Sequence, residues 1–448
     1  MSTVQQWVHL DLKGIIPSEA KLVEWLERLK AWGFSGVVFE YEDRLPWQSL
    51  PGTFRPGYTS ESWKRIWAEC ERIGLEVVPL IQTFGHLEWL LKHERYAHLR
   101  EAGFWNLLCP LHPEAMPLLA RWLDEVIALH PRSRHIHVGL DEVHHLASCP
   151  RCRQATEASK EGVLAVYQRH ATAICEHVLA RGLKPLVWGD MYVNHRRPDL
   201  ARQLPDGAMI CDWGYSSAEP GDTTGVLASS GRPLIGTSAI RCGFDPPYEL
   251  QAPLGERLVN VRGWHRLAVE RGIPILIHTV WGRSRSLLPL YGPWEGWLPA
   301  FIAAGDPQAK LGAAMTAAIE HVDAGLSAVL FQPVLKAAAA IRELRSDDPF
   351  ERQALRWWDI ALRHRHELWW AEKPLGIGSL SMEAMRGHVG VDPDITALKQ
   401  QERRTCLANL AGLEDEIRAF WRDNQLSDEA ELLATHLDSV RRCLLLQG

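Results

Sequence analysis

The sequence lacks the usual features of membrane-spanning and nucleic-acid-binding proteins. No run of about 18 apolar residues occurs in its 448 residues, so no segment predicts a transmembrane helix. The first residues show no basic stretch followed by an apolar one, and we therefore expect no signal peptide. Lysine and arginine number 49 against 55 acidic residues, so no basic excess predicts a nucleic-acid partner.

Two further absences narrow the class of protein. No Gly-x-Gly-x-x-Gly loop follows the first expected strand, so the usual dinucleotide-binding fingerprint is missing. The nine cysteines are scattered and odd in number, which predicts reduced thiols and a cytoplasmic location rather than a disulfide framework. We expect no cofactor, and no metal at the functional site.

Tryptophan, by contrast, is abundant, with 20 residues. Many of these should lie in the core, but the flat indole ring also stacks on the apolar faces of sugars. The count therefore favours a carbohydrate ligand.

Eight short apolar runs alternate with segments that are mostly helical in pattern. Helical segments show apolar residues at spacings of three and four, as in Leu22, Trp25, Leu26 and Leu29. The runs lie at residues 8–12, 36–42, 75–82, 135–143, 184–191, 208–213, 233–238 and 274–281. This alternation predicts an α/β protein with a closed (β/α)8 TIM barrel. A doubly wound open sheet is the alternative.

The character of the chain changes beyond about residue 300, where alanine-rich helical patterns follow one another. We predict a catalytic barrel over residues 1–340 and an all-helical extension over residues 341–448. The extension is expected to pack on the barrel or on a second subunit, which leaves a homodimer open.

One stretch, His135 to His145, organises the expected function. Its β-prone start ends at Gly139, and the adjacent carboxylates Asp141 and Glu142 follow where a strand would open into a loop. Carboxylates at the carboxyl end of a barrel strand are candidates for acid–base catalysis. A solvated turn is the alternative interpretation of such a pair.

The other expected strand ends carry a mixture of acids and aromatic residues. Such a mixture suits a neutral polyhydroxylated ring, whereas phosphate would call for more cations and a glycine-rich loop. The residues are Asp11, Lys13, Glu40, Glu42, Asp43, Gln82, His86, Trp188, Asp190, Asp212, Trp213, Tyr215, Trp281 and Arg283.

The motif His-x-Gly-x-Asp-Glu at residues 137–142 resembles the acid motif of glycoside hydrolase family 20, the β-N-acetylhexosaminidases. The chain is most similar to the hexosaminidase D branch of that family over roughly residues 7–300. The stretches that carry this resemblance are 8–14, 40–43, 82–86, 91–93, 97–101 and 186–188. The motif alone is moderately specific, and the ordered set of stretches is strong.

The resemblance implies an exo-acting, retaining enzyme that removes terminal β-linked GalNAc or GlcNAc from a glycan or glycoconjugate. Two neighbouring carboxylates do not easily straddle a sugar ring as the usual pair does. In this family the substrate's own 2-acetamido oxygen is the nucleophile. Glu142 would be the general acid and later the base, and Asp141 would hold the acetamido N–H. An ionised Asp141 is expected to raise the pKa of Glu142.

The same resemblance assigns the substrate-binding residues. His86 is expected to support the acid pair, the alternative being a surface-loop histidine. Three tryptophans match positions that wall the acetamido pocket, the alternative being ordinary core residues. Either Glu42 or Asp43 is expected to contact ring hydroxyls. The full predicted set is Lys13, Glu42, Asp43, His86, Trp188, Asp190, Trp213, Tyr215, Trp281 and Arg283.

Four positions depart from the family pattern. Lys13 stands where an arginine usually grips the ring hydroxyls, and Gln82 stands where an aspartate is expected. The tyrosine usual after the seventh strand is absent, and Tyr215 is expected to replace it. The last Trp-x-Glu reads Trp281-Gly-Arg283. These changes bear on which hexosamine is preferred, and the branch implies galactosamine.

Two rival functions remain on the sequence alone. His135-x-His137 resembles the ligand pairs of metal-dependent barrel hydrolases, and the altered grip residues allow a non-catalytic sugar-binding protein. Separately, Cys149-Pro-Arg-Cys152 is half of a zinc site. Because the chain has no second Cys-x-x-Cys, a complete site would need His144 and His145 to fold back. Otherwise the motif is a cysteine-bearing loop at the barrel rim.

Overall fold

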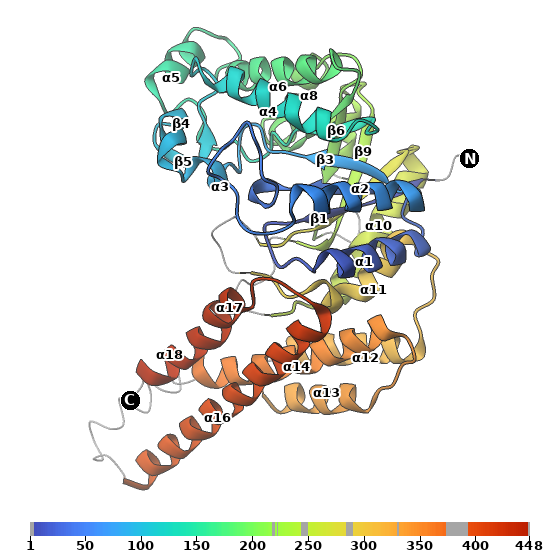
Figure 1. Ribbon diagram of the computed structural model, residues 1–448, viewed down its shortest axis with the longest axis vertical. Coiled ribbons are helices and arrows are strands. Elements are labelled where there is room, and N and C mark those ends of the chain that lie inside the picture. Colours follow the sequence, from blue (N-terminus) through green and yellow to red (C-terminus); the bar gives the residue numbers. More distant parts are fainter. Residues whose placement is uncertain are drawn as a thin grey trace.

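A closed barrel of eight parallel strands forms the larger part of the chain (Figure 1). The computed structural model describes residues 4–216, 220–221, 223–242, 250–283, 290–328, 331–372 and 393–446. Around the barrel the strands follow the order of the chain. They are β1 (Gln5–Asp11), β2 (Gly36–Glu40), β3 (Glu76–Leu80), β6 (His135–His137), β7 (Lys184–Trp188), β8 (Met209–Trp213), β9 (Leu234–Arg241) and β10 (Ile275–Val280). The predicted TIM barrel is confirmed, and the open sheet is excluded.

Helices outside the barrel connect consecutive strands. The helix α2 shows how local sequence sets their ends: the Thr59 side chain accepts the N–H of Ser62, and Gly74 ends the helix in a left-handed conformation. The connecting helices include α1 (Glu19–Ala31), α2 (Ser60–Ile73), α4 (Ala115–Leu129), α6 (Val163–Leu179), α7 (Asp190–Asn194), α8 (Pro198–Ala201), α9 (Thr224–Ala228), α10 (Gly255–Arg271) and α11 (Leu298–Gly305).

Two connections differ from the sequence prediction. A helix that the sequence did not indicate, α5 (Pro150–Glu157), precedes α6, and Gly162 has a φ of 59° between them. Between β3 and α4 lie α3 (Glu88–Leu91), a 3-10 turn (η2, Glu94–Leu99) and a small antiparallel sheet. Its strands are β4 (Arg100–Glu101) and β5 (Phe104–Leu108), which the sequence did not indicate.

The barrel interior is filled with side chains from its own strands. Trp7, Val38, Leu80 and Trp188 belong to this inner cluster and are nearly or fully buried. An added Cβ at Gly36 would lie 2.7 Å from the Trp7 indole, so glycine makes room for a large inward ring. The interior is therefore a packed core, and ligands must enter at the barrel's end.

The C-terminal helices pack together beside the barrel (Figure 1). They contact it directly: Trp358 donates its indole N–H to Gly296 O at 2.9 Å, and His436 Nε2 lies 2.8 Å from Leu290 O. The division predicted between residues 340 and 341 stays a prediction. The helices are α12 (Ala313–Leu326), α13 (Phe331–Glu343), α14 (Pro349–Glu372), α16 (Pro393–Asn424), α17 (Glu429–Leu432), the π-helix η5 (Leu433–Leu437) and α18 (Asp438–Leu446).

None of the helices in the described ranges combines the length and the apolar composition needed to cross a bilayer.

Candidate active site

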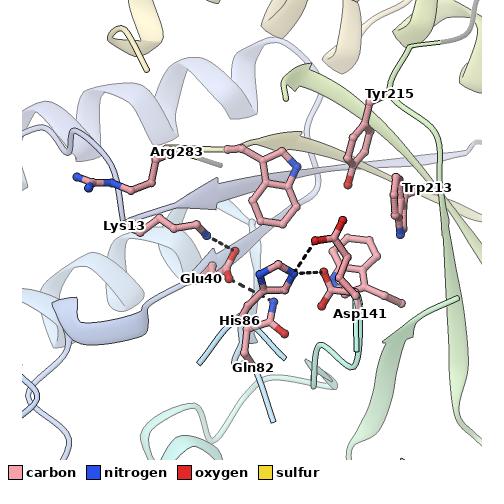
Figure 2. A pocket seen from close by; sticks show the side chains of 11 residues that line it. Lys13, Glu40, Gln82, His86, Asp141, Trp213, Tyr215 and Arg283 are labelled. Atoms are coloured by element: carbon pink, nitrogen blue, oxygen red, sulfur yellow. Dashed lines mark hydrogen bonds and ion pairs between the residues drawn. The ribbon is translucent and has the colours of Figure 1, made fainter. Parts of the chain in front are cut away.

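A pocket opens at the carboxyl ends of the barrel strands (Figure 2). The space between its lining side chains, which is open to solvent at the mouth, is about 600 Å³. Of the predicted site residues, Glu42, Asp43 and Asp190 do not line it. The lining residues are Lys13, Glu40, Gln82, His86, Asp141, Glu142, Trp188, Trp213, Tyr215, Trp281 and Arg283.

The loop after β6 presents the two adjacent carboxylates on the same side. Neighbouring residues of an extended chain point to opposite faces, so this requires an irregular backbone. Gly139, Leu140 and Glu142 all have left-handed conformations, with φ of 72°, 79° and 49°. Each such non-glycine residue costs on the order of 1–2 kcal/mol. The strain is therefore concentrated where the carboxylates enter the pocket.

His86 lies between the two carboxylates. Its Nε2 atom is 3.3 Å from Asp141 Oδ2 and 3.3 Å from Glu142 Oε2 (Figure 2). Burial alone would lower the pKa of His86, but the Asp141 carboxylate and the contact with Glu142 outweigh it and raise that pKa well above its usual range. The two carboxyl groups thus favour the protonated imidazolium form of His86.

Asp190 lies behind the acid pair, at the start of α7. Its Oδ2 atom accepts the backbone N–H of Glu142 at 3.0 Å. Burial, together with the nearby Asp141 carboxylate, raises the pKa of Asp190 to about 7. The sequence placed Asp190 among the substrate contacts, whereas in the structure its carboxylate holds the main chain of Glu142.

Lys13 forms the centre of a buried cluster of charges beside His86. Its Nζ atom lies 3.0 Å from Asp11 Oδ2, 3.4 Å from Glu40 Oε2 and 3.7 Å from Glu42 Oε1. Burial would lower the pKa of Lys13, but these three carboxylates outweigh it and raise the pKa. Glu40 Oε2 also lies 2.9 Å from His9 Nε2. Burial would raise the pKa of Glu40, but Lys13 and His9 outweigh this effect and lower it.

Glu40 is the pocket acid that the substrate-binding prediction missed. The sequence extended the second strand to residue 42, but β2 ends at Glu40 and residues 42–44 form a 3-10 turn. Glu42 therefore turns toward Lys13, and burial raises its pKa to about 8. Asp43 does not reach the pocket: its Oδ1 atom lies 3.3 Å from Arg55 Nε, and its Oδ2 atom lies 3.6 Å from Lys92 Nζ. Strand length, not residue type, decided which acid enters the pocket.

Gln82 also lines the pocket without having been predicted as a ligand contact. Its Nε2 atom lies 3.4 Å from Glu40 Oε1. Its Oε1 atom is buried and has no hydrogen-bond partner among the described residues. The Nε2 side of the Gln82 amide therefore faces Glu40, while its Oε1 atom lies beside Gly139.

Aromatic rings form the opposite wall. Trp213 and Tyr215 stack with centroids 5.1 Å apart, and the centroids of Trp188 and Trp281 are 6.4 Å apart. Figure 2 shows Trp213 and Tyr215 on one side of His86, with Lys13 and Glu40 on the other. One wall is thus apolar and one is charged, which suits a ring with C–H faces and hydroxyl edges.

Arg283 lines the pocket, but its guanidinium points away from His86 (Figure 2). Its Nη1 atom lies 2.8 Å from Glu431 Oε1 in α17, so the side chain connects the pocket wall to the C-terminal helices. The sequence did not indicate this partner.

The histidine pair that suggested a metal hydrolase, His135 and His137, contacts other groups of the protein. His135 Nδ1 lies 2.8 Å from Glu76 Oε1, and His137 Nδ1 accepts the N–H of Gly139 at 3.1 Å while its ring packs on Trp188. In the part of the chain that the structure describes, the only group of potential metal ligands lies elsewhere, at Glu101, Cys109, Cys149 and Cys152.

Part of the barrel matches the catalytic domain of a known protein family. Residues 44–259 match the catalytic domain of glycosyl hydrolase family 20. Hexosaminidase D of Homo sapiens is 34% identical over 246 residues, which cover 53% of this chain and 48% of that protein. Hexosaminidase D of Bos taurus is 39% identical over 189 residues, 41% of this chain and 55% of that protein. The chain thus matches about half the length of these curated relatives.

Solved structures show the same fold at low identity. A β-N-acetylhexosaminidase from Bacteroides fragilis NCTC 9343 has a TM-score of 0.52 at 15% identity, covering 69% of this chain and 68% of that one. A family 20 β-N-acetylhexosaminidase from Streptomyces coelicolor A3(2) has a TM-score of 0.51 at 18% identity, covering 77% and 70%. Residues 44–259 therefore match the glycosyl hydrolase family 20 catalytic domain, and the chain is similar to hexosaminidase D over the aligned residues.

Proposed function

We propose that this protein is an exo-acting, retaining β-N-acetylhexosaminidase that uses the substrate's 2-acetamido group as nucleophile. The observation that carries the proposal is the position of His86 between Asp141 and Glu142, in a tryptophan-walled pocket at the catalytic end of a family 20 barrel.

The position of the carboxylates limits the mechanism. A retaining enzyme with two catalytic carboxylates places the sugar between them, about 5–5.5 Å apart. Here Asp141 and Glu142 are neighbours in sequence and both contact the same His86 nitrogen, Nε2. This arrangement does not resemble two acids on opposite faces of a sugar ring. It therefore supports a nucleophile supplied by the substrate.

Exposure supports the two proposed roles. The Glu142 side chain is 31% exposed and the Asp141 side chain 11%. Glu142, nearer the mouth, protonates the glycosidic oxygen as the acetamido oxygen attacks the anomeric carbon and the bond to the leaving group breaks. Asp141, which lies deeper, accepts the acetamido N–H and balances the positive charge of the oxazoline-like intermediate.

The second half of the reaction reverses the proton transfer. Glu142, now a carboxylate beside the His86 cation, takes a proton from water as that water attacks the anomeric carbon. The acetamido group is released and the configuration is retained. His86 thus stabilises Glu142 in the form that exists between the two steps.

The decisive experiment compares 4-nitrophenyl N-acetyl-β-D-glucosaminide and galactosaminide with the matching plain β-glucoside and galactoside. Turnover should require the 2-acetamido group. Equal hydrolysis of a substrate with a hydroxyl at carbon two would contradict the mechanism. Binding of the N-acetyl sugar without any turnover would indicate the sugar-binding alternative.

Finer properties belong to the same proposal. We expect galactosamine substrates to be preferred, as the resemblance to hexosaminidase D implies. Lys13, Glu40 and Gln82 line the part of the pocket where ring hydroxyls would lie. We also propose a cytoplasmic location, which the nine free thiols support. A homodimer stays a prediction.

A further inference from the structure

Three cysteines and a glutamate meet outside the active-site pocket. The ligand atoms of Glu101, Cys109, Cys149 and Cys152 all lie within 4.8 Å of one another. They come from three segments: β4, the residue after β5, and the start of α5. Figure 1 shows β4, β5 and α5 together at one side of the barrel.

The spacing of the sulfur atoms is that of a metal site. Cys109 Sγ lies 3.7 Å from Cys149 Sγ and 3.6 Å from Cys152 Sγ. Tetrahedral zinc with Zn–S bonds of about 2.3 Å sets neighbouring sulfur atoms about 3.8 Å apart. A disulfide would bring two of them to about 2.05 Å. The three thiols are thus held near the edge length of a zinc tetrahedron.

Glu101 provides a second, independent indication of a cation-binding site. The residue is fully buried. Its Oε1 atom accepts the backbone N–H of Cys149 at 2.7 Å, but its Oε2 atom is buried with no hydrogen-bond partner among the described residues. A buried carboxylate oxygen without a partner is costly, and a bound cation removes that cost.

Backbone and side-chain groups contact the sulfur atoms and hold them in place. Cys149 is the N-cap of α5, and its Sγ atom accepts the N–H of Cys152 at 3.4 Å. Arg151 Nη1 lies 3.8 Å from Cys109 Sγ. These contacts fix the positions of the Cys149 and Cys109 sulfur atoms.

From these observations we infer that Cys109, Cys149, Cys152 and Glu101 bind one zinc ion. Cys149 and Cys152 have the Cys-x-x-Cys spacing common in zinc sites. Thiolates select zinc over the hard cations calcium and magnesium. The predicted alternative, in which His144 and His145 complete the site, is wrong: both are exposed, and the His145 ring stacks on Phe104 at 4.2 Å.

The ion would join the two segments that carry the acid pair and His86. Leu108, just before Cys109, donates its backbone N–H to Phe84 O at 3.1 Å, and Leu87 donates to Asn106 O at 3.2 Å. The β5 strand therefore flanks His86 directly, while Cys149 follows Glu142 in the next loop. With four protein ligands the site is closed, so the zinc has a structural role.

Metal analysis of the full-length chain tests the site and does not depend on glycosidase activity. The protein is produced without a histidine tag in zinc-supplemented medium, passed through gel filtration and analysed by elemental mass spectrometry. We expect about one zinc per chain. Replacement by Co²⁺ should give sulfur-to-cobalt charge-transfer bands in the near ultraviolet and tetrahedral d–d bands in the visible.

Variants assign the ligands. Cys109→Ser and Cys152→Ser should lose most of the zinc, and Glu101→Gln should bind it more weakly in a chelator titration. Cys443→Ser removes an exposed cysteine outside the cluster and should keep the full content.

The wild-type measurements decide the matter even if a ligand variant fails to fold. Absence of both zinc and the cobalt bands would overturn the proposal. So would a disulfide among these three cysteines in freshly purified protein, iron in place of zinc, or a full zinc content in folded Cys152→Ser.

Discussion

Asp190 Oδ2 accepts the main-chain N–H of Glu142 at 3.0 Å, from the side away from the pocket. Because Glu142 has a strained φ of 49°, this bond helps to hold the carboxylate where it reaches the leaving group. Asp190 is thus a positioning residue.

Replacing Asp190 should therefore affect turnover more than binding. We expect Asp190→Ala to lower kcat about 10–100-fold with little change in KM, as for removal of a supporting contact. Asp190→Asn keeps an acceptor oxygen and should recover much of the loss. A large rise in KM at unchanged kcat, measured with a nitrophenyl N-acetylhexosaminide, would instead indicate direct substrate contact.

Glu142→Gln should reveal the general acid through its dependence on the leaving group. General acid catalysis contributes about 10²–10⁴-fold, so kcat should fall by about that factor for a poor leaving group such as a methyl glycoside. A nitrophenolate leaves with less protonation, and its kcat for glycosyl transfer should fall less. An equal loss for both substrates would argue against the acid role.

Asp141 should show the opposite behaviour, because its proposed partner is the acetamido N–H. Asp141→Ala should lower kcat for both leaving groups to a similar extent, about 10²–10³-fold by analogy with loss of one transition-state hydrogen-bond partner. Full activity of this variant would rule out acetamido participation supported by Asp141.

The raised pKa of His86 predicts how stability depends on pH. The folded pKa lies well above the ordinary value of 6.5 because of Asp141 and Glu142, against the effect of burial. The folded state then binds more protons than the unfolded state, so this stabilisation is full below about pH 6.5 and is lost as pH rises through the folded pKa.

Thermal unfolding of wild type and His86→Gln measures this effect. The Tm difference in favour of wild type should be larger at pH 6 than at pH 9. His145→Gln, an exposed histidine outside the pocket, serves as the control and should show no such trend. A difference that grows with pH would show that His86 is not held as a cation.

The barrel was predictable because each strand is a compact apolar run followed by a helical period, and these local signals add up over eight repeats. The acid pair was predictable because a barrel places strand ends at one face. The predictions that failed concerned strand ends, which were misplaced by one or two residues. The sequence gives no sign that β2 stops at Glu40, and so it favoured Glu42 or Asp43 over Glu40.

Contacts between distant segments were not predictable at all. Cys109 lies near Cys149 and Cys152 only because β5 runs beside the segment that carries His86. Arg283 meets Glu431 only because the C-terminal helices pack against the mouth of the barrel. No spacing or composition in a single chain records which remote partner a charged residue finds.

The Arg283–Glu431 contact predicts a change in stability without a change in substrate affinity. Arg283 is 3% exposed and Glu431 is 37% exposed. Glu431→Gln should lower the free energy of unfolding by about 1–2 kcal/mol, a partly buried pair being worth less than a buried one. The KM should stay unchanged. Glu429→Gln is the matched control and should cost less, because its partner Arg418 is 42% exposed whereas Arg283 is buried. A raised KM in Glu431→Gln would restore Arg283 as a substrate contact.

Gly139 is required by both conformation and space. Its φ is 72°, and an added Cβ would lie 1.9 Å from Gln82 Oε1 and 3.2 Å from the Gln82 Cα. Gly139→Ala should therefore destabilise the fold by about 3–5 kcal/mol, combining left-handed strain with overpacking. Gly182→Ala separates the two effects, because Gly182 has a φ of 82° with no atom within 4 Å and should cost only about 1–2 kcal/mol.

The two costs can be separated further in a double variant. Gln82→Ala removes the side-chain atoms that the new Cβ meets but leaves the backbone contact, so Gly139→Ala should cost less in the Gln82→Ala background than in wild type. Urea denaturation of the four proteins gives the coupling energy. If Gly139→Ala costs the same in both backgrounds, the Gln82 side chain does not constrain the loop. The position of the acid pair would then depend on left-handed backbone alone.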